Sequence, residues 1–342
     1  MPNSQTYRNA FIVLILLLFC SFFINISLGS VSIPLRDVFH SIFGTSSNES
    51  WRYIILNYRL PKAISAILVG SGLGISGLLM QTLFRNPLAG PFVLGISSGA
   101  SLGVALVILG SGLFGGTCAA LLTSKWSVVI AASLGSFMVL LAVLIVSSRV
   151  RDTMSILIIG LMFASITGAI VGVLSYFSSA EQLQRYVFWG FGSLGNLSWQ
   201  ELTVFGAIYS VGLLLSLGSI KALNTLLLGD NYAKSLGLNL KQSRLFIILA
   251  TSLLAGTITA FAGPIAFIGL AIPHVTRLVF NTSNHKILLP AVLLVGGVIM
   301  LICDTIAQIP NSDYTLPINA ITSLVGAPIV IWLLVRKRNL MF

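Results

Sequence analysis

The sequence predicts an all-α integral membrane protein of about ten transmembrane helices with both termini in the cytoplasm. Hydrophobic residues fill 56% of its 342 positions and charged residues only 8%, whereas a soluble domain carries roughly 25% charged residues. Apolar residues run continuously over stretches long enough to cross the hydrocarbon core. Lys and Arg also gather in alternate connecting segments, as orientation of spanning helices requires. We expect one transmembrane domain, 1–342.

The apolar runs are continuous rather than alternating, which favours helices over strands. Inside lipid only helices and closed barrels satisfy every backbone group. The first run is longer than the core of a cleaved signal peptide, so we expect it to be retained as a helix. The eighth is short and contains Pro273. The expected spans are 10–29, 61–83, 91–110, 127–147, 154–177, 201–219, 244–262, 265–280, 287–307 and 316–335.

The distribution of basic residues tests this order of spans. With the N-terminus inside, the outer segments hold six basic residues: Arg36, Arg52, Arg59, Lys62, Lys125 and Arg185. The inner segments hold thirteen: Arg8, Arg85, Arg149, Arg151, Lys221, Lys234, Lys241, Arg244, Arg277, Lys286, Arg336, Lys337 and Arg338. This excess of basic residues in the inner segments supports an even number of spans. It also explains the net charge of +11, because the basic residues are too scattered to form a nucleic-acid-binding surface.

Two connecting segments are too long to be simple turns. Residues 30–60 lie outside in this topology and contain Trp51, Tyr53 and Tyr58, which suits an amphipathic segment at the membrane interface. Residues 220–243 lie inside, and their polar residues alternate with leucines. We expect there a pair of short helices along the cytoplasmic surface, where a soluble partner could grip them.

The run Gly72–Gly77 matches the dinucleotide-binding pattern G-x-G-x-x-G, but it lies inside an apolar span and no acidic residue follows before Asp152. Gly70 and Gly74 instead have the spacing that lets two membrane helices approach closely. The chain also contains no Gly-Lys pair, so it has no standard phosphate-binding loop. If ATP drives this protein, a separate subunit binds the ATP.

Catalytic and metal-binding patterns are also absent from the sequence. The three histidines are far apart in the sequence: His40, His274 and His285. The three cysteines, Cys20, Cys118 and Cys303, do not have the spacing of metal ligands. We therefore expect no enzyme activity, metal or cofactor. Ion-coupled carriers place ionisable groups at mid-membrane. Here only Asp304 falls within a span, near its outer end, where capping or pairing is the favoured interpretation. His274 beside Pro273 is interpreted as structural.

The segment Trp189–Trp199 is rich in glycine and aromatic residues at an outer boundary. Two interpretations remain open for it. One is an aromatic belt at the lipid–water interface, and the other is a flexible outer mouth of a substrate pathway.

Several segments together resemble the FecCD-type permeases of ATP-binding-cassette (ABC) importers for iron chelates, haem and cobalamin. The similarity covers nearly the whole chain after about residue 30. The segments that carry it are Arg59–Lys62, Val69-Gly70, Ser76-Gly77, Met80-Gln81, Arg85–Pro91, Leu94–Ala100, Leu228–Gly237, Gly263–Leu270 with Pro273-His274 and Arg277, and Gly326–Pro328.

The resemblance implies a homodimer of ten-helix subunits in the bacterial inner membrane, with the translocation path between them. Two cytoplasmic ABC ATPase subunits and an extracytoplasmic substrate-binding protein are the implied partners. Arg59 and Lys62 would meet acidic residues of the binding protein, and Thr153 and Met154 would lie at the inner gate. The implied ATPase-coupling residues are Leu228, Gly229, Asp230, Ala233, Lys234, Ser235, Leu236 and Gly237.

The sequence departs from the family pattern at the outer loop after the ninth span. Gln308 stands where an Arg is frequent, and Thr315 stands where an acidic residue often precedes Leu-Pro. A second docking salt bridge is therefore in doubt. The expected substrate is an iron chelate (siderophore or haem), with cobalamin as the alternative and an ion-coupled secondary transporter as the alternative from another class.

Overall fold

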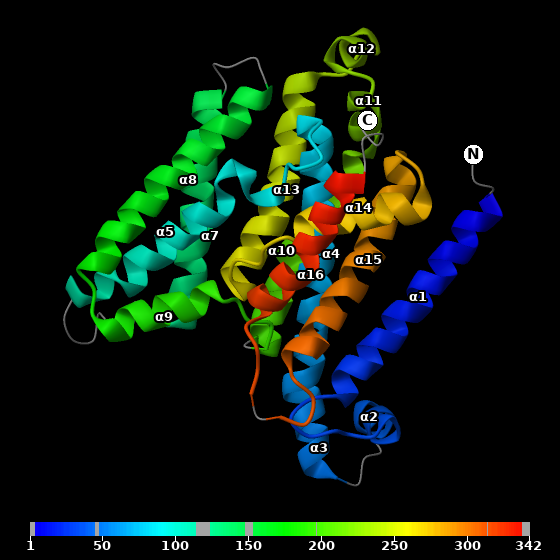
Figure 1. Cartoon of the computed structure of the whole chain (residues 1–342), viewed down its shortest axis with the longest axis vertical. Helices are drawn as coiled ribbons and strands as arrows, with labels where there is room; N and C mark the ends of the chain where they lie inside the picture. The colour runs from blue at the N-terminus through cyan, green and yellow to red at the C-terminus, as the bar shows by residue number, and fades with distance from the viewer. Residues whose placement is uncertain are drawn as a thin grey trace.

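The computed structural model describes residues 4–44, 48–113, 124–147, 153–195, 197–312 and 314–336, and within these ranges it is helical without any strand (Figure 1). Seven of the described helices are long and apolar enough to cross a membrane, and three shorter apolar helices accompany them. Each corresponds to one expected span. They are α1 (Ser4–Ser27), α4 (Leu60–Phe84), α5 (Ile96–Ile108), α7 (Lys125–Ser147), α8 (Thr153–Tyr176), α10 (Trp199–Gly218), α13 (Leu240–Ala262), α14 (Ile268–Phe280), α15 (His285–Ala307) and α16 (Ile318–Arg336).

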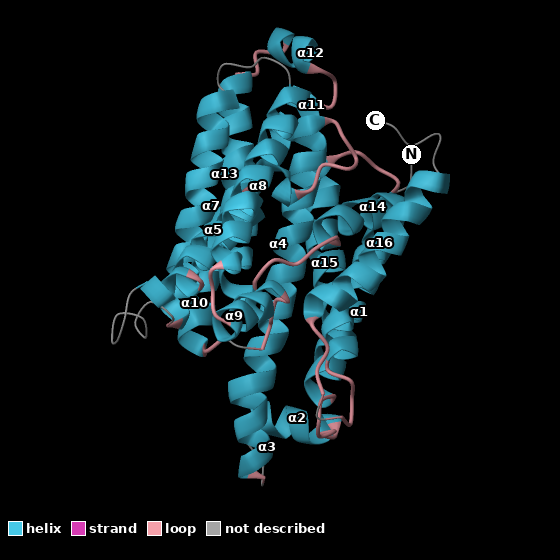
Figure 2. Cartoon of the chain, turned by 60° about the vertical axis from the view of Figure 1, so that its left-hand side comes forward, coloured by secondary structure: helices cyan, strands magenta, loops and turns pink. Residues whose placement is uncertain are grey.

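Short helices occupy both long connecting segments, whereas the sequence predicts them only for residues 220–243 and an amphipathic segment for residues 30–60. Residues 30–60 form α2 (Leu35–Ile42) and α3 (Glu49–Ile54), and a π-helical turn then leads into α4. Residues 220–243 include α11 (Ile220–Leu226) and α12 (Asp230–Ser235). Figures 1 and 2 show α11 and α12 at one end of the molecule and α2 and α3 at the opposite end. We call them the inner and outer ends, after the topology that the sequence predicts.

Two expected spans begin later than the sequence suggests, because backbone turns precede them. The third was expected from residue 91, but α5 begins at Ile96, after Gly95 adopts a left-handed conformation with φ of 76°. The eighth was expected from residue 265, but α14 begins at Ile268, after Phe267 with φ of 63°. Left-handed residues do not continue a right-handed helix, so both helices are short.

Helix α4 forms the centre of the bundle, where it packs against α15, α13, α14 and α10. A Cβ atom added at Gly70 would overlap the carbonyl oxygen of Gly296 on α15. One added at Gly74 would meet side chains of Ile272 and Val292 at 2.9–3.0 Å. These glycines permit close helix packing. The interpretation of this glycine run as a packing feature, rather than a nucleotide motif, is confirmed.

A second lobe contains α5, α7 and α8, on the left of Figure 1. Gly99 and Gly103 of α5 lie directly against Gly135 and Ala131 of α7, where an added Cβ would overlap the opposing backbone. Helix α13 contacts α4 and α10 on one side and α5 and α7 on the other. It therefore joins the second lobe to the central bundle.

Candidate functional site

The segment between α10 and α13 presents large apolar side chains at the inner end. Leu228, Tyr232 and Leu236 are 59%, 63% and 60% exposed, whereas Ala233 on the opposite side of α12 is fully buried. Exposed apolar side chains at the end of a membrane protein can be covered by a partner protein. All three belong to the short stretch 228–236, and together we call them the inner patch.

Two glycines bracket α12 and set its position. Gly229 has φ of 105° and Gly237 has φ of 83°, conformations that residues with a Cβ rarely adopt. Lys234 and Ser235 between them are exposed. Among the predicted coupling residues, Ala233 alone is buried, and it fastens the helix that the others present.

A charged cluster ties this segment to two long helices. Asp230 lies 2.9 Å from an Nη of Arg85, at the end of α4, and 2.5 Å from an Nη of Arg244 on α13. Arg85 also donates through Nε to the carbonyl oxygen of Leu226 at 3.2 Å. One carboxylate thus bridges two guanidinium groups, and the first turn of α12 is held against both helices.

Helix α11 has a second attachment, made through a histidine at the start of α15. The side-chain oxygen of Asn224 accepts from the backbone N–H of His285 at 2.9 Å and lies 2.8 Å from Nδ1 of the same residue. Nε2 of His285 lies 2.8 Å from Oγ1 of Thr82 on α4. A neutral imidazole with its proton on Nδ1 satisfies both side-chain contacts. The segment is therefore mounted on α4, α13 and α15 together.

At the outer end, Arg59 fastens the end of α1 to the start of α4. Its guanidinium donates to the carbonyl oxygens of Ile26 at 2.7 Å and Ser27 at 2.9 Å, and also to that of Val31. No carboxylate pairs with Arg59 in the part of the chain that the structure describes. The residue predicted to dock a partner thus has an internal bonding role and an unneutralised charge.

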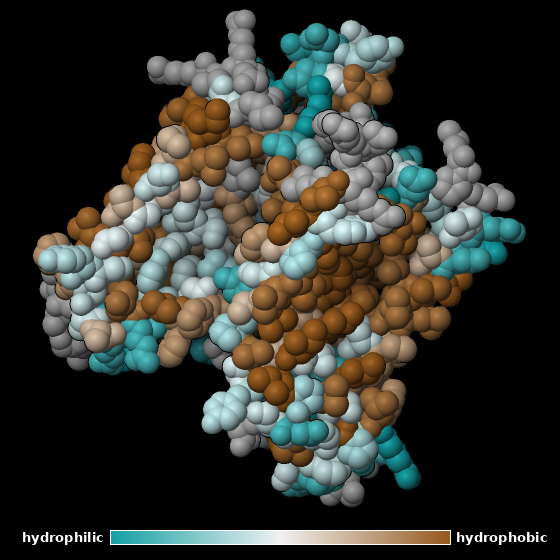
Figure 3. All heavy atoms as spheres, viewed as in Figure 1, coloured by the Kyte–Doolittle hydropathy of each residue, from teal (hydrophilic) through white to brown (hydrophobic). Residues whose placement is uncertain are grey.

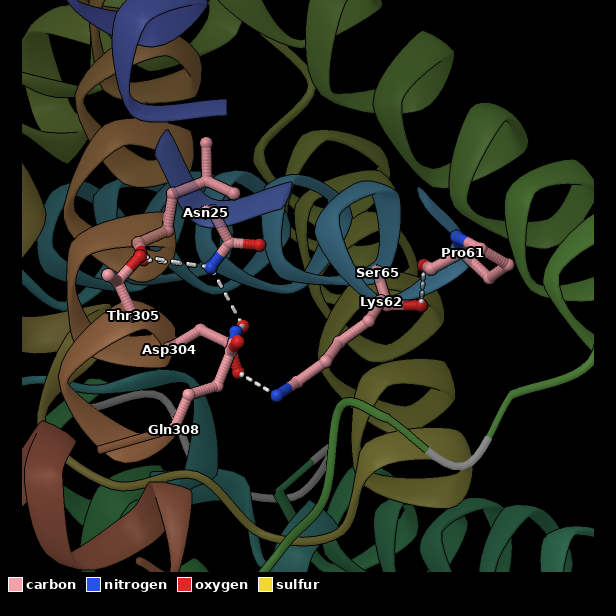
Figure 4. A network of polar contacts seen from close by, with 8 residues as sticks. Asn25, Pro61, Lys62, Ser65, Asp304, Thr305 and Gln308 are labelled. Carbon is pink, nitrogen blue, oxygen red and sulfur yellow. Dashed lines mark hydrogen bonds and ion pairs between the residues drawn. The ribbon is translucent and has the colours of Figure 1, made fainter. Parts of the chain in front are cut away.

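Lys62, the other predicted docking residue, forms an ion pair with Asp304 at 3.2 Å (Figure 4). The Lys62 side chain is 21% exposed and that of Asp304 only 3%. Asn25 donates to Oδ2 of Asp304 at 2.9 Å, and Gln308 donates to the same oxygen at 2.7 Å. The cluster joins α1, α4 and α15. The expectation that Asp304 pairs near the outer boundary is confirmed.

The sequence offered a partial signal for this outer cluster. Asp304 stood out as the acidic residue within a span, but its partners lie 242 and 279 positions away in the chain, at Lys62 and Asn25. Gln308, noted as a departure from the family pattern, serves as a donor to Asp304. Thr315 is exposed.

His274 was interpreted from the sequence as a structural residue. Its Nε2 lies 2.8 Å from the carbonyl oxygen of Pro87, in the loop that follows α4. Gln81 donates to the carbonyl oxygen of Leu270 at 3.3 Å and accepts from Arg277. These contacts hold the loop on α14, so the structural interpretation of His274 agrees with its position.

The predicted inner-gate residues fall at the start of α8. This helix begins at Thr153, and the side chains of Thr153 and Met154 lie outside the part of the chain that the structure describes. Their role stays a prediction.

On the face shown in Figure 3, the surface is hollowed between the second lobe and the central bundle, and its pale colours mark weakly hydrophilic residues. Beyond α9 (Ala180–Gly190), the chain crosses between two helices at the outer end. The N–H of Ser193 donates to Ala262 of α13 at 2.9 Å, and that of Asn319 of α16 donates to Phe191 at 3.2 Å. This glycine-rich segment is therefore held against the bundle.

Fold and surface together define a class of protein: a multi-helix membrane protein with exposed apolar side chains on the short helix at one end. The chain belongs to the FecCD transport family, whose model matches residues 15–336. It is 36% identical over 316 residues to a hemin transport system permease protein of Yersinia pestis, covering 92% of this chain and 93% of that one. Family membership makes it the permease subunit of an ABC importer.

Two further similarities agree with this assignment. A vitamin B12 import system permease protein of Klebsiella pneumoniae is 38% identical over 286 residues, 83% of each chain. A solved structure of an inward-facing metal-chelate type ABC transporter superposes with a TM-score of 0.83 at 30% identity, covering 96% of this chain and all of that one. The family is shared by relatives with different named substrates.

Proposed function

We propose that this permease carries an iron chelate, a siderophore complex or haem, across the bacterial inner membrane. The observation that carries the proposal is the match to a hemin permease over nine-tenths of both chains, together with the structural match to a metal-chelate type transporter. The weakly hydrophilic hollow fits a large chelate that is passed without tight binding (Figure 3). The chain spans the membrane with ten helices as a single domain, both ends inside.

The energy for transport comes from two separate ATPase subunits that grip residues 220–243. The patch of Leu228, Tyr232 and Leu236 enters a groove of the ATPase, and the Asp230 cluster transmits the movement to α4 and α13. Rigid mounting favours transmission as a rigid-body motion. The start of α8, at Thr153 and Met154, forms the inner gate.

A substrate-binding protein docks at the outer end around Arg59 and Lys62. Arg59 carries a positive charge that no carboxylate of the described chain neutralises, and Lys62 retains a fifth of its side chain exposed. An acidic residue of the partner would gain long-range attraction to both, which speeds and orients association. Asp304 competes for Lys62, so Arg59 supplies the larger share of this attraction.

Two copies of the chain form a homodimer around the substrate path. Large apolar side chains remain exposed along α8 and α16, including Met162, Ile166, Leu324 and Ile331. A second copy or lipid covers these faces. Placing α8 beside the path puts the inner gate at its start.

Cobalamin is the alternative substrate, because the B12 permeases match at similar identity. The test is uptake into proteoliposomes that contain this chain, its ATPase and its binding protein. We expect ATP-dependent uptake of labelled haem or ferric siderophore that excess unlabelled cobalamin does not reduce. Competition by cobalamin would assign the alternative instead.

An ion-coupled carrier is the alternative from another class, and the same vesicles distinguish it. Uptake by an ABC importer persists with a protonophore and stops without ATP. Uptake that collapses with the protonophore and survives ATP depletion would contradict the proposal. Replacement of the exposed side chains of residues 229–237 should abolish uptake. Phe43→Ser, which changes an exposed residue of the outer end and leaves the inner surface intact, is the control.

A further inference from the structure

A cavity of about 300 Å³ lies at the outer ends of α5, α7, α9, α10 and α13. Its volume is at the lower end of those of small-molecule sites. The transport role proposed above makes no use of it. Most of its walls are apolar, and two ionisable side chains, Lys125 and Glu201, also line it. The apolar walls include Ile108, Val128, Val129, Phe188, Trp189 and Phe261.

Glu201 presents a buried carboxylate with one oxygen still available. Its side chain is 8% exposed. Oε2 accepts from the N–H of Ser198 at 2.7 Å and from its hydroxyl at 2.8 Å, which caps the start of α10. Oε1 accepts no hydrogen bond from the described residues. This oxygen can therefore accept a hydrogen bond from a bound donor.

Lys125 brings the opposite charge to the same cavity. Its Nζ lies 3.9 Å from Oε2 of Glu201, farther than a hydrogen bond, and its side chain is 64% exposed. An ammonium group has three N–H donors, so Lys125 can pair with an anion while it stays near the carboxylate. The cavity therefore offers one site for a cation and one for an anion, a few ångströms apart.

The aromatic walls favour an ammonium group over a plain apolar ligand. Phe188, Trp189 and Phe261 line the cavity beside the carboxylate, and aromatic faces attract cations. Trp126 and Trp199, at the first turns of α7 and α10, are exposed. Exposed tryptophans at helix ends mark the level of the lipid headgroups. The cavity thus opens where phospholipid headgroups lie.

We propose that this cavity binds the headgroup of an outer-leaflet phospholipid that has both a phosphate and a primary amine. The ammonium group donates to Oε1 of Glu201, the phosphate pairs with Lys125, and the first acyl carbons lie along Val128 and Phe261. A choline headgroup has no N–H to donate to Glu201. A glycerol headgroup carries no positive charge for the carboxylate.

The test compares lipids retained by the purified full-length chain. The chain is equilibrated in detergent with equal amounts of phosphatidylethanolamine, phosphatidylcholine and phosphatidylglycerol, and the bound lipid is quantified by native mass spectrometry. We expect about tenfold enrichment of phosphatidylethanolamine, the size of one charged hydrogen bond. Equal retention of the three lipids would overturn the proposal.

Variants locate the effect in the cavity. Glu201→Gln keeps a side-chain oxygen for the α10 cap but removes the charge, so the enrichment should fall to the level of phosphatidylcholine. Lys125→Ala should weaken retention of phosphatidylethanolamine without affecting the cap. Glu181→Gln, an exposed acid paired with Arg185 on α9 and outside the cavity, is the matched control and should retain wild-type enrichment. Unchanged enrichment in Glu201→Gln would contradict the assignment.

A last arm distinguishes lipid from a free solute. Soluble phosphoethanolamine carries the same charged groups without the acyl chains. At the concentration of the lipid it should displace none of the bound phosphatidylethanolamine, because the apolar walls contribute to binding. Full displacement would show that the cavity takes a soluble zwitterion, and would overturn the lipid assignment.

Discussion

The two ends of this permease use charged residues in opposite ways. At the inner end, Asp230 with Arg85 and Arg244 holds a segment that projects apolar side chains outward. At the outer end, the ion pair of Lys62 and Asp304 lies between helices, and Asn25 and Gln308 donate hydrogen bonds to the Asp304 carboxylate. One cluster positions the segment that we propose as a contact surface, and the other joins three helices of the bundle.

The difference lies in burial. The inner carboxylate is 38% exposed, while the outer one is 3% exposed. A partly exposed ion pair contributes little free energy and serves mainly to position its helix. A buried charge whose partner is removed is costly, because desolvation is no longer offset. Stability should therefore depend on the outer cluster, and coupling on the inner one.

The largest expected effect is on stability, from Lys62→Ala. This change leaves the buried carboxylate of Asp304 without its counter-ion and should lower the free energy of unfolding by about 3–5 kcal/mol. Thermal unfolding of the purified chain in detergent measures it. A double change, Lys62→Met with Asp304→Leu, should recover most of the loss. If Lys62→Ala alone is as stable as the wild type, the outer cluster does not stabilise the bundle.

The next effect is on partner binding, from Leu236→Ser. Removing an exposed apolar anchor from the inner patch should weaken ATPase binding by about 2 kcal/mol, roughly thirtyfold. Unfolding temperature should stay unchanged, since the side chain is 60% exposed. Phe43→Ser, at an exposed position of the outer end, is the control and should bind the ATPase normally. If Leu236→Ser lowers stability but keeps ATPase binding, the inner patch contributes to folding rather than to partner binding.

A smaller effect is expected from Asp230→Ala. The ion pairs are partly exposed, so unfolding should be easier by only about 1 kcal/mol. Uptake should nevertheless fall strongly, because α12 loses its attachment to α4 and α13. The measurement is uptake and ATP hydrolysis in the same vesicles, and hydrolysis that continues while uptake stops would show uncoupling. Unchanged uptake would show that the Asp230 cluster does not transmit movement from the ATPase to α4 and α13.

The smallest effect is expected from Arg185→Ala. Its pair with Glu181 lies on the surface of α9 with both side chains more than half exposed, so the change should alter the free energy of unfolding by less than about 0.5 kcal/mol. Unfolding in detergent measures it beside Lys62→Ala. A loss as large as that of the buried pair would mean that burial is not what separates the two ends.

The helical content and the order of the spans followed from the sequence, because length and continuous apolarity are local properties. The short pair of helices in 220–243 was predicted from its local alternation of polar residues and leucines, whereas 30–60 was predicted as an amphipathic segment without its two helices. The coupling residues came from motif resemblance, and the structure places them together on one segment. Helix starts at Ile96 and Ile268 were misjudged, because single left-handed residues leave little trace in composition.

What the sequence determined by itself is the class of molecule: a charge-poor bundle of apolar helices, for which the basic residues predict an orientation. What only the tertiary structure decided is which polar groups meet. Asn25, Lys62 and Asp304 come from the two ends of the chain, and Lys125 and Glu201 from different helices. Such partners are chosen by packing across hundreds of residues, because a charge inside a bundle must find its counter-ion wherever the fold places one.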